Sequence, residues 1–129
     1  MIDATSTASD IAAAVRAGTV SAADIVEQTV TRIERLNGTL NAFTYLDVDR
    51  AKAAAARIDR LVKEGTDPGP LAGATFAVKN LFDIDGVVTL AGSKINRDHA
   101  PARADSPLIE RLTAAGAILI GALNMGEYA

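Results

Sequence analysis

The stretch PLAGATFAVKNLFDIDGVVTLAGS, residues 70–93, holds the strongest structural and functional signals of the chain. Its apolar run from Thr75 to Val78 predicts a buried strand, and a single lysine, Lys79, follows at once. A lysine in that position is either a solvated strand end or a buried group that carries protons. The role of Lys79 is therefore the central functional question.

The composition predicts one α/β domain. The chain has 129 residues, 49% of them hydrophobic, with no tryptophan, two tyrosines and three phenylalanines. The apolar content is thus mostly alanine and aliphatic side chains, which is typical of helices packed closely on a sheet.

Charge and cysteine usage exclude several classes of function. The formal net charge is −3, with acidic and basic residues interleaved, and this pattern offers no basic face for nucleic acid. Cysteine is absent, which excludes a disulfide framework and a thiolate nucleophile. The acidic start MIDATSTASD does not resemble a targeting peptide, and no apolar run has the length of a membrane span. We therefore expect a cytoplasmic protein that binds neither nucleic acid nor a membrane.

Four stretches combine a capping residue at the start with a glycine at the end, and each predicts a helix. They are residues 7–17, 21–36, 47–64 and 106–115. The dipeptide Asn37-Gly38 is expected to end the second helix. The face of that helix expected to pack on the core consists of Ile25, Thr29, Ile33 and Leu36.

Besides the strand before Lys79, two more segments have strand character. Residues 117–120 form an apolar run that predicts a buried strand, and residues 41–46 alternate over a short distance. Because the helix at 106–115 comes directly before the 117–120 strand, the pair predicts part of a crossover unit.

A linker and a turn surround the lysine strand. Residues 66–73 are rich in glycine and proline and cannot continue the preceding helix. Asp85-Gly86 lies between the apolar runs 81–84 and 87–90, which predicts a hairpin or a tight bend.

Taken by themselves, the residues favour the solvated interpretation of Lys79, because lysine is rarely buried without a partner. A general base would require burial that lowers the lysine pKa toward the working pH. The apolar neighbours Ala77, Val78 and Leu81 would permit this burial. The next residue, Asn80, is an amide, whereas an adjacent carboxylate would stabilise the charged lysine.

The other candidate residues have simpler interpretations. Asp83 and Asp85 could form an acid and base pair, but their position beside a glycine is typical of a turn. Ser93 lacks the surrounding pattern of a nucleophile elbow and is interpreted as a structural serine. His99, the only histidine, lies in a polar loop without a second ligand, which favours a solvated residue over a metal site.

The chain resembles the N-terminal quarter of an amidase signature family hydrolase. The matching segments are residues 70–93 and ADSPLIERLTAAGAILIGALNMGEYA at 104–129, and the helical first 65 residues with the motif NAF at Asn41–Phe43 also fit. The resemblance implies an α/β fold in which N-terminal helices precede the first strands and helix of a mixed sheet that is incomplete in this chain.

The same resemblance implies how the chain is organised. Residues 1–129 would form the N-terminal part of a single domain, helical over 1–65 and rich in strands over 66–129. The chain stops at Ala129 without a cap or a polar closing segment, so we expect it to be cut from a longer protein.

The family hydrolyses amide C–N bonds with a triad of Ser, cis-Ser and Lys, and the resemblance implies that Lys79 is the catalytic lysine. It would accept a proton through a bridging serine that activates the nucleophilic serine. The glycine- and serine-rich stretch that supplies both serines would come after Ala129, and Ser93 matches a different family position. The 129-residue chain alone is therefore expected to be inactive.

Two subgroups of the family fit the motif wording. VKNLFDI and TLAGSKIN are most similar to hydrolases of small ureides such as 1-carboxybiuret, and the amidase-type subunits of glutamyl-tRNA amidotransferases are the alternative. Resemblance to the ureide hydrolases implies a small amide or ureide substrate, no metal or organic cofactor and a small helical partner subunit. The protein could form either homo-oligomers or hetero-oligomers. An alternative of another class is a non-catalytic binding or assembly module.

Overall fold

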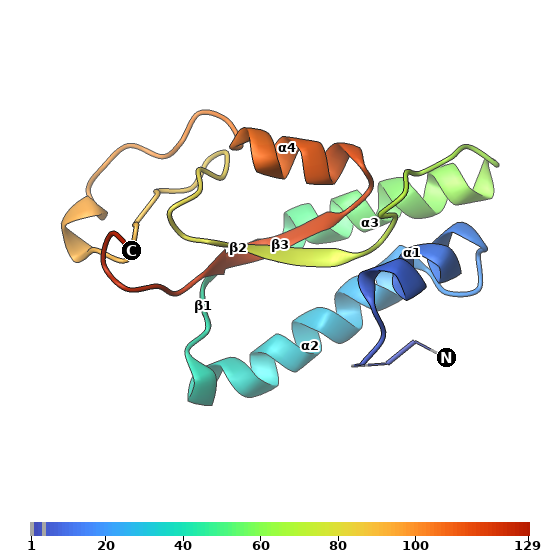
Figure 1. The fold of residues 1–129 in the computed structure, drawn as a ribbon, viewed down its shortest axis with the longest axis horizontal. Coiled ribbons are helices and arrows are strands. Elements are labelled where there is room, and N and C mark those ends of the chain that lie inside the picture. The colour runs from blue at the N-terminus through green and yellow to red at the C-terminus, as the bar shows by residue number, and fades with distance from the viewer. Residues whose placement is uncertain (1, 4) are drawn as a thin grey trace.

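The fold is a small mixed sheet with helices on both faces, as the computed structural model shows for residues 2–3 and 5–129 (Figure 1). In chain order the elements are α1 (Ala8–Arg16), α2 (Ala22–Leu40), β1 (Phe43–Leu46), α3 (Val48–Lys63), β2 (Thr75–Lys79), a 3-10 turn (Lys94–Asn96), α4 (Pro107–Ala114) and β3 (Ile118–Leu123). The predicted α/β class is confirmed. No helix in this described part of the chain is long and apolar enough to cross a membrane.

Strand β3 lies at the centre of the sheet, whose order is β1-β3-β2. β2 runs parallel to β3 and β1 antiparallel to it. Helix α4 connects the two parallel strands, so the predicted crossover unit is confirmed. β2 was expected to be buried, but its residues 75–78 are only half-buried because it is an edge strand.

Strand β3 supplies side chains to two cores, and an irregularity in it shifts which residues face each core. Leu119 pairs with Phe76 and Gly121 pairs with the next residue of β2, so Ile120 is an extra residue between them. Leu119 and Ile120 face opposite cores through the ordinary alternation of a strand, so Ile120 lies in the core against α1–α3 and Leu119 in the core under α4. Because of the extra residue, Ala122 lies in the same core as Leu119, three positions earlier.

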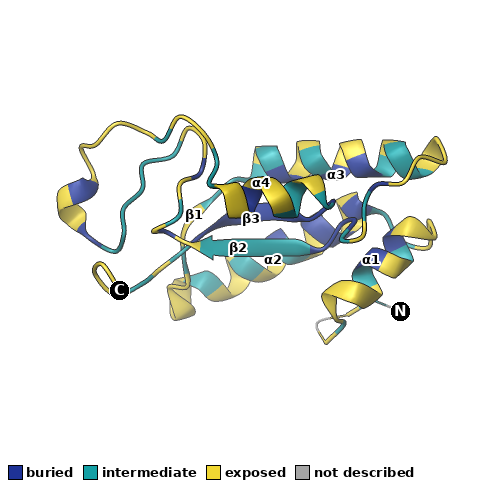
Figure 2. Ribbon diagram, turned by 45° about the horizontal axis from the view of Figure 1, so that its top comes forward, coloured by how far each residue is buried: buried dark blue, intermediate teal, exposed yellow. Residues whose placement is uncertain are grey.

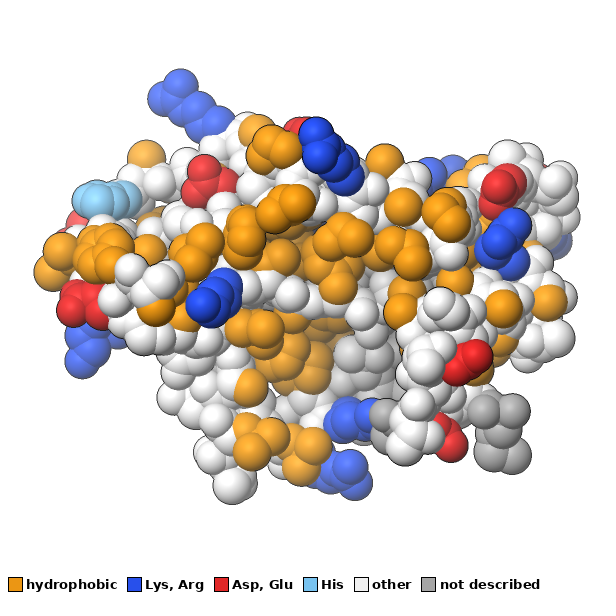
Figure 3. Space-filling view, in the orientation of Figure 1, with side chains coloured by type: hydrophobic (Ala, Val, Ile, Leu, Met, Phe, Trp, Pro, Cys, Tyr) orange, Lys and Arg blue, Asp and Glu red, His pale blue; other side chains and the backbone are white. Residues whose placement is uncertain are grey.

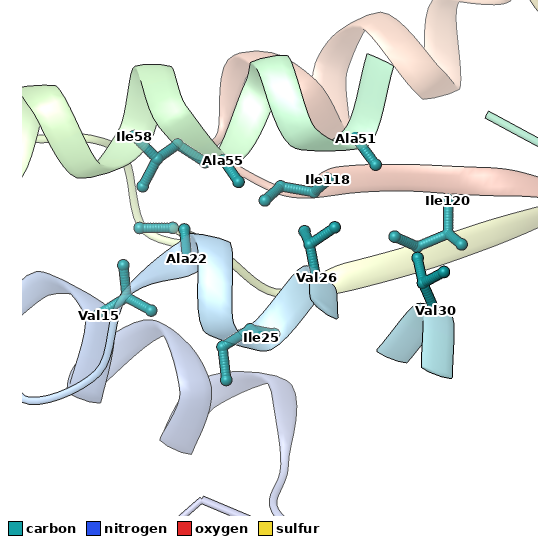
Figure 4. Close-up of a cluster of buried hydrophobic side chains, with 11 residues drawn as sticks. Val15, Ala22, Ile25, Val26, Val30, Ala51, Ala55, Ile58, Ile118 and Ile120 are labelled. Atoms are coloured by element: carbon teal, nitrogen blue, oxygen red, sulfur yellow. The ribbon is translucent and has the colours of Figure 1, made fainter. Parts of the chain in front are cut away.

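The larger core is made by three helices packed on one face of the sheet (Figure 4). Its buried members are Val15, Ala22, Ile25, Val26, Val30, Ala51, Ala55, Ile58, Ala72, Ile118 and Ile120. The alanines of α3 let this helix approach α2 closely. The smaller core, on the opposite face, consists of Ile84, Ile109, Leu119 and Ala122.

Three of the four predicted helix starts have the expected side-chain cap. Thr7 and Asp10 form a reciprocal capping box, and Ser21 and Asp47 each accept a hydrogen bond from a backbone N–H of the first turn. Ser106 differs, because its buried hydroxyl has no partner among the described residues. Its backbone N–H instead donates to the carbonyl of Asp83 (2.9 Å), which ties the start of α4 to the preceding loop.

Helix α2 continues past its predicted end. Asn37-Gly38 was expected to stop it, but the helix runs to Leu40. The Asn37 side chain is engaged elsewhere, since its Oδ1 accepts from the Phe43 N–H (2.8 Å) and its Nδ2 donates to the Phe43 carbonyl (3.1 Å). Asn41 takes the left-handed conformation, with φ of 49°, and ends the helix in place of Gly38.

The buried face of α2 also differs from the expected one. Ile25 is buried and Ile33 is half-buried, but Leu36 is 40% exposed. The buried residues of the helix are Ala22, Ile25, Val26 and Val30. Only the first three turns of α2 therefore lie fully against the core.

The predicted hairpin is wrong, although the tight bend that was its alternative is present. Val87 N–H donates to the Ile84 carbonyl (3.0 Å) across Asp85-Gly86, and Gly86 has φ of +77°. Its arms do not pair with each other. Gly86 and Val87 instead exchange backbone hydrogen bonds with Ala102 (2.9 and 3.0 Å), so a distant segment replaces the hairpin partner.

A partly buried ion pair joins three segments that are distant in sequence. The Arg50 guanidinium at the start of α3 donates to both carboxylate oxygens of Asp105, which also accepts from the Asp85 N–H (2.9 Å). The hydrogen bond from Arg50 is the main cause that lowers the pKa of Asp105 below 3.8. The charged pair thus holds the 80–106 loop against α3.

Asp105→Asn should lower the free energy of unfolding at neutral pH by about 1–3 kcal/mol, because Arg50 loses its charged partner. The Asp105 pKa is lowered on folding, so its stabilisation is present above pH 3.8 and is lost as the pH falls below that value. Urea denaturation at a series of pH values should show the two proteins converging below about pH 3.8. An equal difference at every pH would contradict this.

Gly121→Ala should be strongly destabilising because a Cβ atom there would lie 2.0 Å from the Tyr45 carbonyl oxygen on β1. The expected loss in thermal or urea denaturation is about 2–3 kcal/mol. Gly38→Ala is the matched control, since Gly38 lies inside α2 with nothing within 4 Å of its would-be Cβ. That change should stabilise by up to about 1 kcal/mol. Equal effects of the two changes would refute the close-approach explanation.

Candidate functional site

The candidate site is the edge of the sheet where the two parallel strands end. Lys79, the last residue of β2, pairs with Leu123, the last residue of β3. Ligands of open α/β sheets bind outside the carboxyl ends of the strands. Figure 2 shows the exposed tip of half-buried β2 directed toward the long loops.

Lys79 lies on the sheet face that α2 covers further back along the strand. The Thr75 hydroxyl is 3.5 Å from the Thr29 hydroxyl of α2. Lys79 comes four residues later, so its side chain points to the same side of the strand as that of Thr75. The adjacent Val78 packs in the core under α4. The Lys79 side chain is exposed and makes no hydrogen bond or ion pair with residues 2–3 or 5–129.

The backbone around Lys79 is well ordered by hydrogen bonds. The Lys79 carbonyl accepts from the Phe82 N–H (3.1 Å), which forms a tight turn directly after the strand. The Asn80 N–H donates to the Leu123 carbonyl (3.0 Å) and extends the parallel ladder by one residue. The position of the lysine Cα is therefore set by both neighbouring segments.

Asn80 is buried, with 5% of its surface exposed, and its polar atoms are paired. Oδ1 accepts from the Gly92 N–H (3.0 Å) and Nδ2 donates to the Thr44 hydroxyl (3.2 Å). The Asn80 carbonyl accepts from the Ala91 N–H (2.9 Å). Sequence reasoning noticed this residue only as a neutral neighbour of Lys79, because its partners lie 11 to 43 positions away.

Ser93 holds the 90–96 loop to the segment after β3. Its buried hydroxyl donates to the Glu127 carboxylate (2.5 Å). Nearby, the Tyr128 N–H donates to the Ala91 carbonyl (2.9 Å) and the Tyr128 hydroxyl to Asn96 Oδ1 (3.0 Å). These contacts agree with the structural role expected for Ser93. Glu127 was missed because no spacing relates it to a serine 34 positions earlier.

A shallow cavity of about 150 Å³ lies on the Asn80 side of the strand end. It is lined by Thr44, Asn80, Leu90, Gly92, Ser93, Lys94, Arg97 and Asn124. Lys79 does not line it, as expected for neighbours on opposite sides of a strand. The amide and the lysine thus belong to two separate surfaces.

The remaining candidates do not gather at this edge. Asp85 lies in the tight bend, and Asp83 accepts from the Thr89 hydroxyl (2.5 Å), so both have the turn roles expected for them. His99 is exposed in the loop before α4. Within residues 2–3 and 5–129, no three His, Asp or Glu side chains are grouped to hold a metal ion.

Sequence comparison relates most of the chain to one family. The family model described as Amidase matches residues 24–129. The chain is 52% identical over 120 residues to AtzE, a component of the 1-carboxybiuret hydrolase of Pseudomonas sp. (strain ADP), covering 93% of this chain and 26% of that protein. It is 41% identical over 117 residues to the A component of the glutamyl-tRNA(Gln) amidotransferase of Anaeromyxobacter sp. (strain K), covering 91% and 24%. The chain thus spans about a quarter of the length of these relatives.

Solved structures have the same fold over nearly the whole chain. An inhibitor-bound vestigial protein complex, which reveals the evolutionary origins of an s-triazine catabolic enzyme, matches with a TM-score of 0.94 and 50% identity, covering 96% of this chain and 27% of that one. The native peptide amidase of Stenotrophomonas maltophilia matches with a TM-score of 0.87 and 31% identity, covering 98% and 26%. With the family model matching more than half of its residues, the chain belongs to the amidase signature family.

Proposed function

We propose that this chain contributes the general base of an amide hydrolase and that Lys79 is that base. The observation that carries the proposal is the position of Lys79 at the carboxyl edge of the parallel strand pair, inside the region that the family model matches. Membership of the amidase signature family supports hydrolysis of C–N bonds as the reaction class.

In the proposed reaction the neutral Lys79 amine takes a proton from a bridging serine, which takes one from the nucleophilic serine. The serine oxygen attacks the amide carbonyl carbon, the C–N bond breaks, and the proton passes to the leaving nitrogen. Water then cleaves the acyl-enzyme ester. We propose that both serines and the oxyanion hole come from further chain, since the relatives are about four times longer.

A lysine base also requires protection from water, because hydration favours its charged form. Lys79 is exposed in the described chain, so its proposed role depends on cover by other segments or by substrate. A band of hydrophobic side chains crosses the face over β2 and α4 (Figure 3) and supports such cover. The 129 residues alone should therefore be inactive.

We propose that residues 1–129 form part of one domain. The larger core supports this, because it joins the helices of residues 8–63 to β3 in a continuous cluster. A domain boundary near the 66–73 linker would divide that cluster.

The proposed substrate is 1-carboxybiuret or a related small ureide. The higher identity to the 1-carboxybiuret hydrolase component, 52% against 41% for the amidotransferase component, supports this choice. A partner subunit is proposed as well, because the solved relative with a TM-score of 0.94 is a protein complex. The amidotransferase function is the second candidate, and a non-catalytic module is the candidate of another class.

Lys79→Ala and Lys79→Met in the full-length protein should each lower kcat by about 10²–10⁴-fold, the usual contribution of a general base. Steady-state amide hydrolysis at fixed pH measures this. Lys52→Met is the matched control, since Lys52 is exposed on α3 in the same way, and it should keep the parent activity. Parent-like rates in both Lys79 variants would refute the base assignment.

The full-length protein with its partner should hydrolyse 1-carboxybiuret faster than glutamine or simple aliphatic amides. A comparison of kcat/KM across these compounds and biuret measures the preference. A preference for glutamine would favour the amidotransferase function. Hydrolysis of none of them by a folded, complete protein would contradict the proposed reaction class.

A further inference from the structure

We propose that Asn80 is a positioning residue for Lys79: its amide locks the end of β2 so that the lysine leaves the sheet in one direction. The inference rests on the proposed function of Lys79 and adds to it the element that orients the base. It is carried by the hydrogen bonds and burial of Asn80.

Asn80 joins the strand end to three other parts of the fold. Its N–H donates to Leu123 of β3 (3.0 Å), and its Nδ2 donates to Thr44 of β1 (3.2 Å). Its carbonyl and Oδ1 accept from the consecutive N–H groups of Ala91 and Gly92 (2.9 and 3.0 Å). The hydrogen bonds of this one residue therefore link all three strands of the sheet and bind the loop that follows β2.

The loop that receives Asn80 is itself anchored. Tyr128 donates to the carbonyl of Ala91, and Ser93 donates to Glu127 (2.5 Å). Both contacts come from the segment after β3. The loop that binds the Asn80 amide is therefore fixed in turn by the segment that follows β3.

The burial of Asn80 fixes the direction in which the Lys79 side chain points. Asn80 is 5% exposed, whereas the adjacent Lys79 is exposed. Successive side chains of a strand point to opposite faces, so a fixed Asn80 side chain directs Lys79 to the other face. A displacement of about 1 Å in a catalytic group can cost about 10²-fold in rate. The orientation of Asn80 thus determines where the Lys79 amine can lie.

The chemistry of the site suits a neutral amide. Asn80 must accept from Gly92 and donate to Thr44, and Thr44 in turn donates to the Ala122 carbonyl (3.3 Å). An aspartate could still accept from Gly92, but it would bring a negative charge beside the lysine. That charge would stabilise protonated Lys79 and raise its pKa.

The test uses the full-length enzyme with its partner and measures kcat, KM and the pH dependence of kcat/KM. Asn80→Ala should lower kcat by about 10–100-fold with little change in KM, because the base is displaced while substrate binding remains. Asn80→Asp should recover much of kcat at high pH. Its acidic limb of kcat/KM should move up by about 0.5–1 pH unit.

Asp59→Ala provides the matched control. The Asp59 carboxylate accepts from the backbone N–H groups of Ala22 and Ala23 (2.6 and 3.1 Å) at the start of α2. Its loss should lower the melting temperature through the same kind of side-chain-to-backbone contact. It should leave kcat and the acidic limb unchanged, which separates a structural effect from a positioning effect.

The outcomes distinguish this inference from the proposed function. A parent-like rate in Lys79→Met overturns the proposed function and, with it, the role of Asn80. An inactive Lys79→Met together with parent-like kcat in Asn80→Ala and an unmoved acidic limb in Asn80→Asp overturns the positioning role alone. If Asn80→Ala does not fold, Thr44→Val replaces it, and it should lower kcat with KM retained.

Discussion

Strand β3 has to be buried on both faces and paired along both edges, and the arrangement of the other elements follows from this constraint. Its first five residues are all buried. The alternation of its side chains lets this one short strand supply both cores, with Ile118 and Ile120 on one face and Leu119 and Ala122 on the other. Gly121 admits the Tyr45 carbonyl so closely that β1 can pair along the second edge. The helices then cover the two faces because only there can their apolar sides be removed from water.

The candidate site is a consequence of this packing. Parallel pairing with β3 brings Lys79 beside Leu123, at the edge where the loops gather. Because side chains alternate along the strand, the consecutive residues Lys79 and Asn80 then point to opposite faces of the sheet. Asn80 enters a buried network in which an unpaired amide would be costly, whereas Lys79 is directed to the other face and is exposed. The same geometry therefore gives rigidity to the backbone and leaves the proposed base available to whatever covers it.

Predictions from sequence succeeded where the signal is local. The capping residue Thr7 correctly placed the start of α1, and the helix and strand of residues 106–120 correctly indicated a crossover unit. They failed where a distant partner competes. Asn37 resembles a helix stop, but its side chain binds Phe43 and the helix continues. The arms around Asp85-Gly86 resemble a hairpin, but Ala102 takes the hydrogen bonds that a second strand would have made.

The sequence by itself determined the helix starts, the α/β class, the lysine at a strand end and, through its motifs, the family. These depend on residues a few positions apart, whose spacing is visible in the chain. Only the tertiary structure decided that Lys79 is exposed, that Asn80 is buried and fully paired, and that Arg50 meets Asp105. Burial and long-range hydrogen bonding depend on which distant segments share a surface, and that is settled by packing around β3 as a whole.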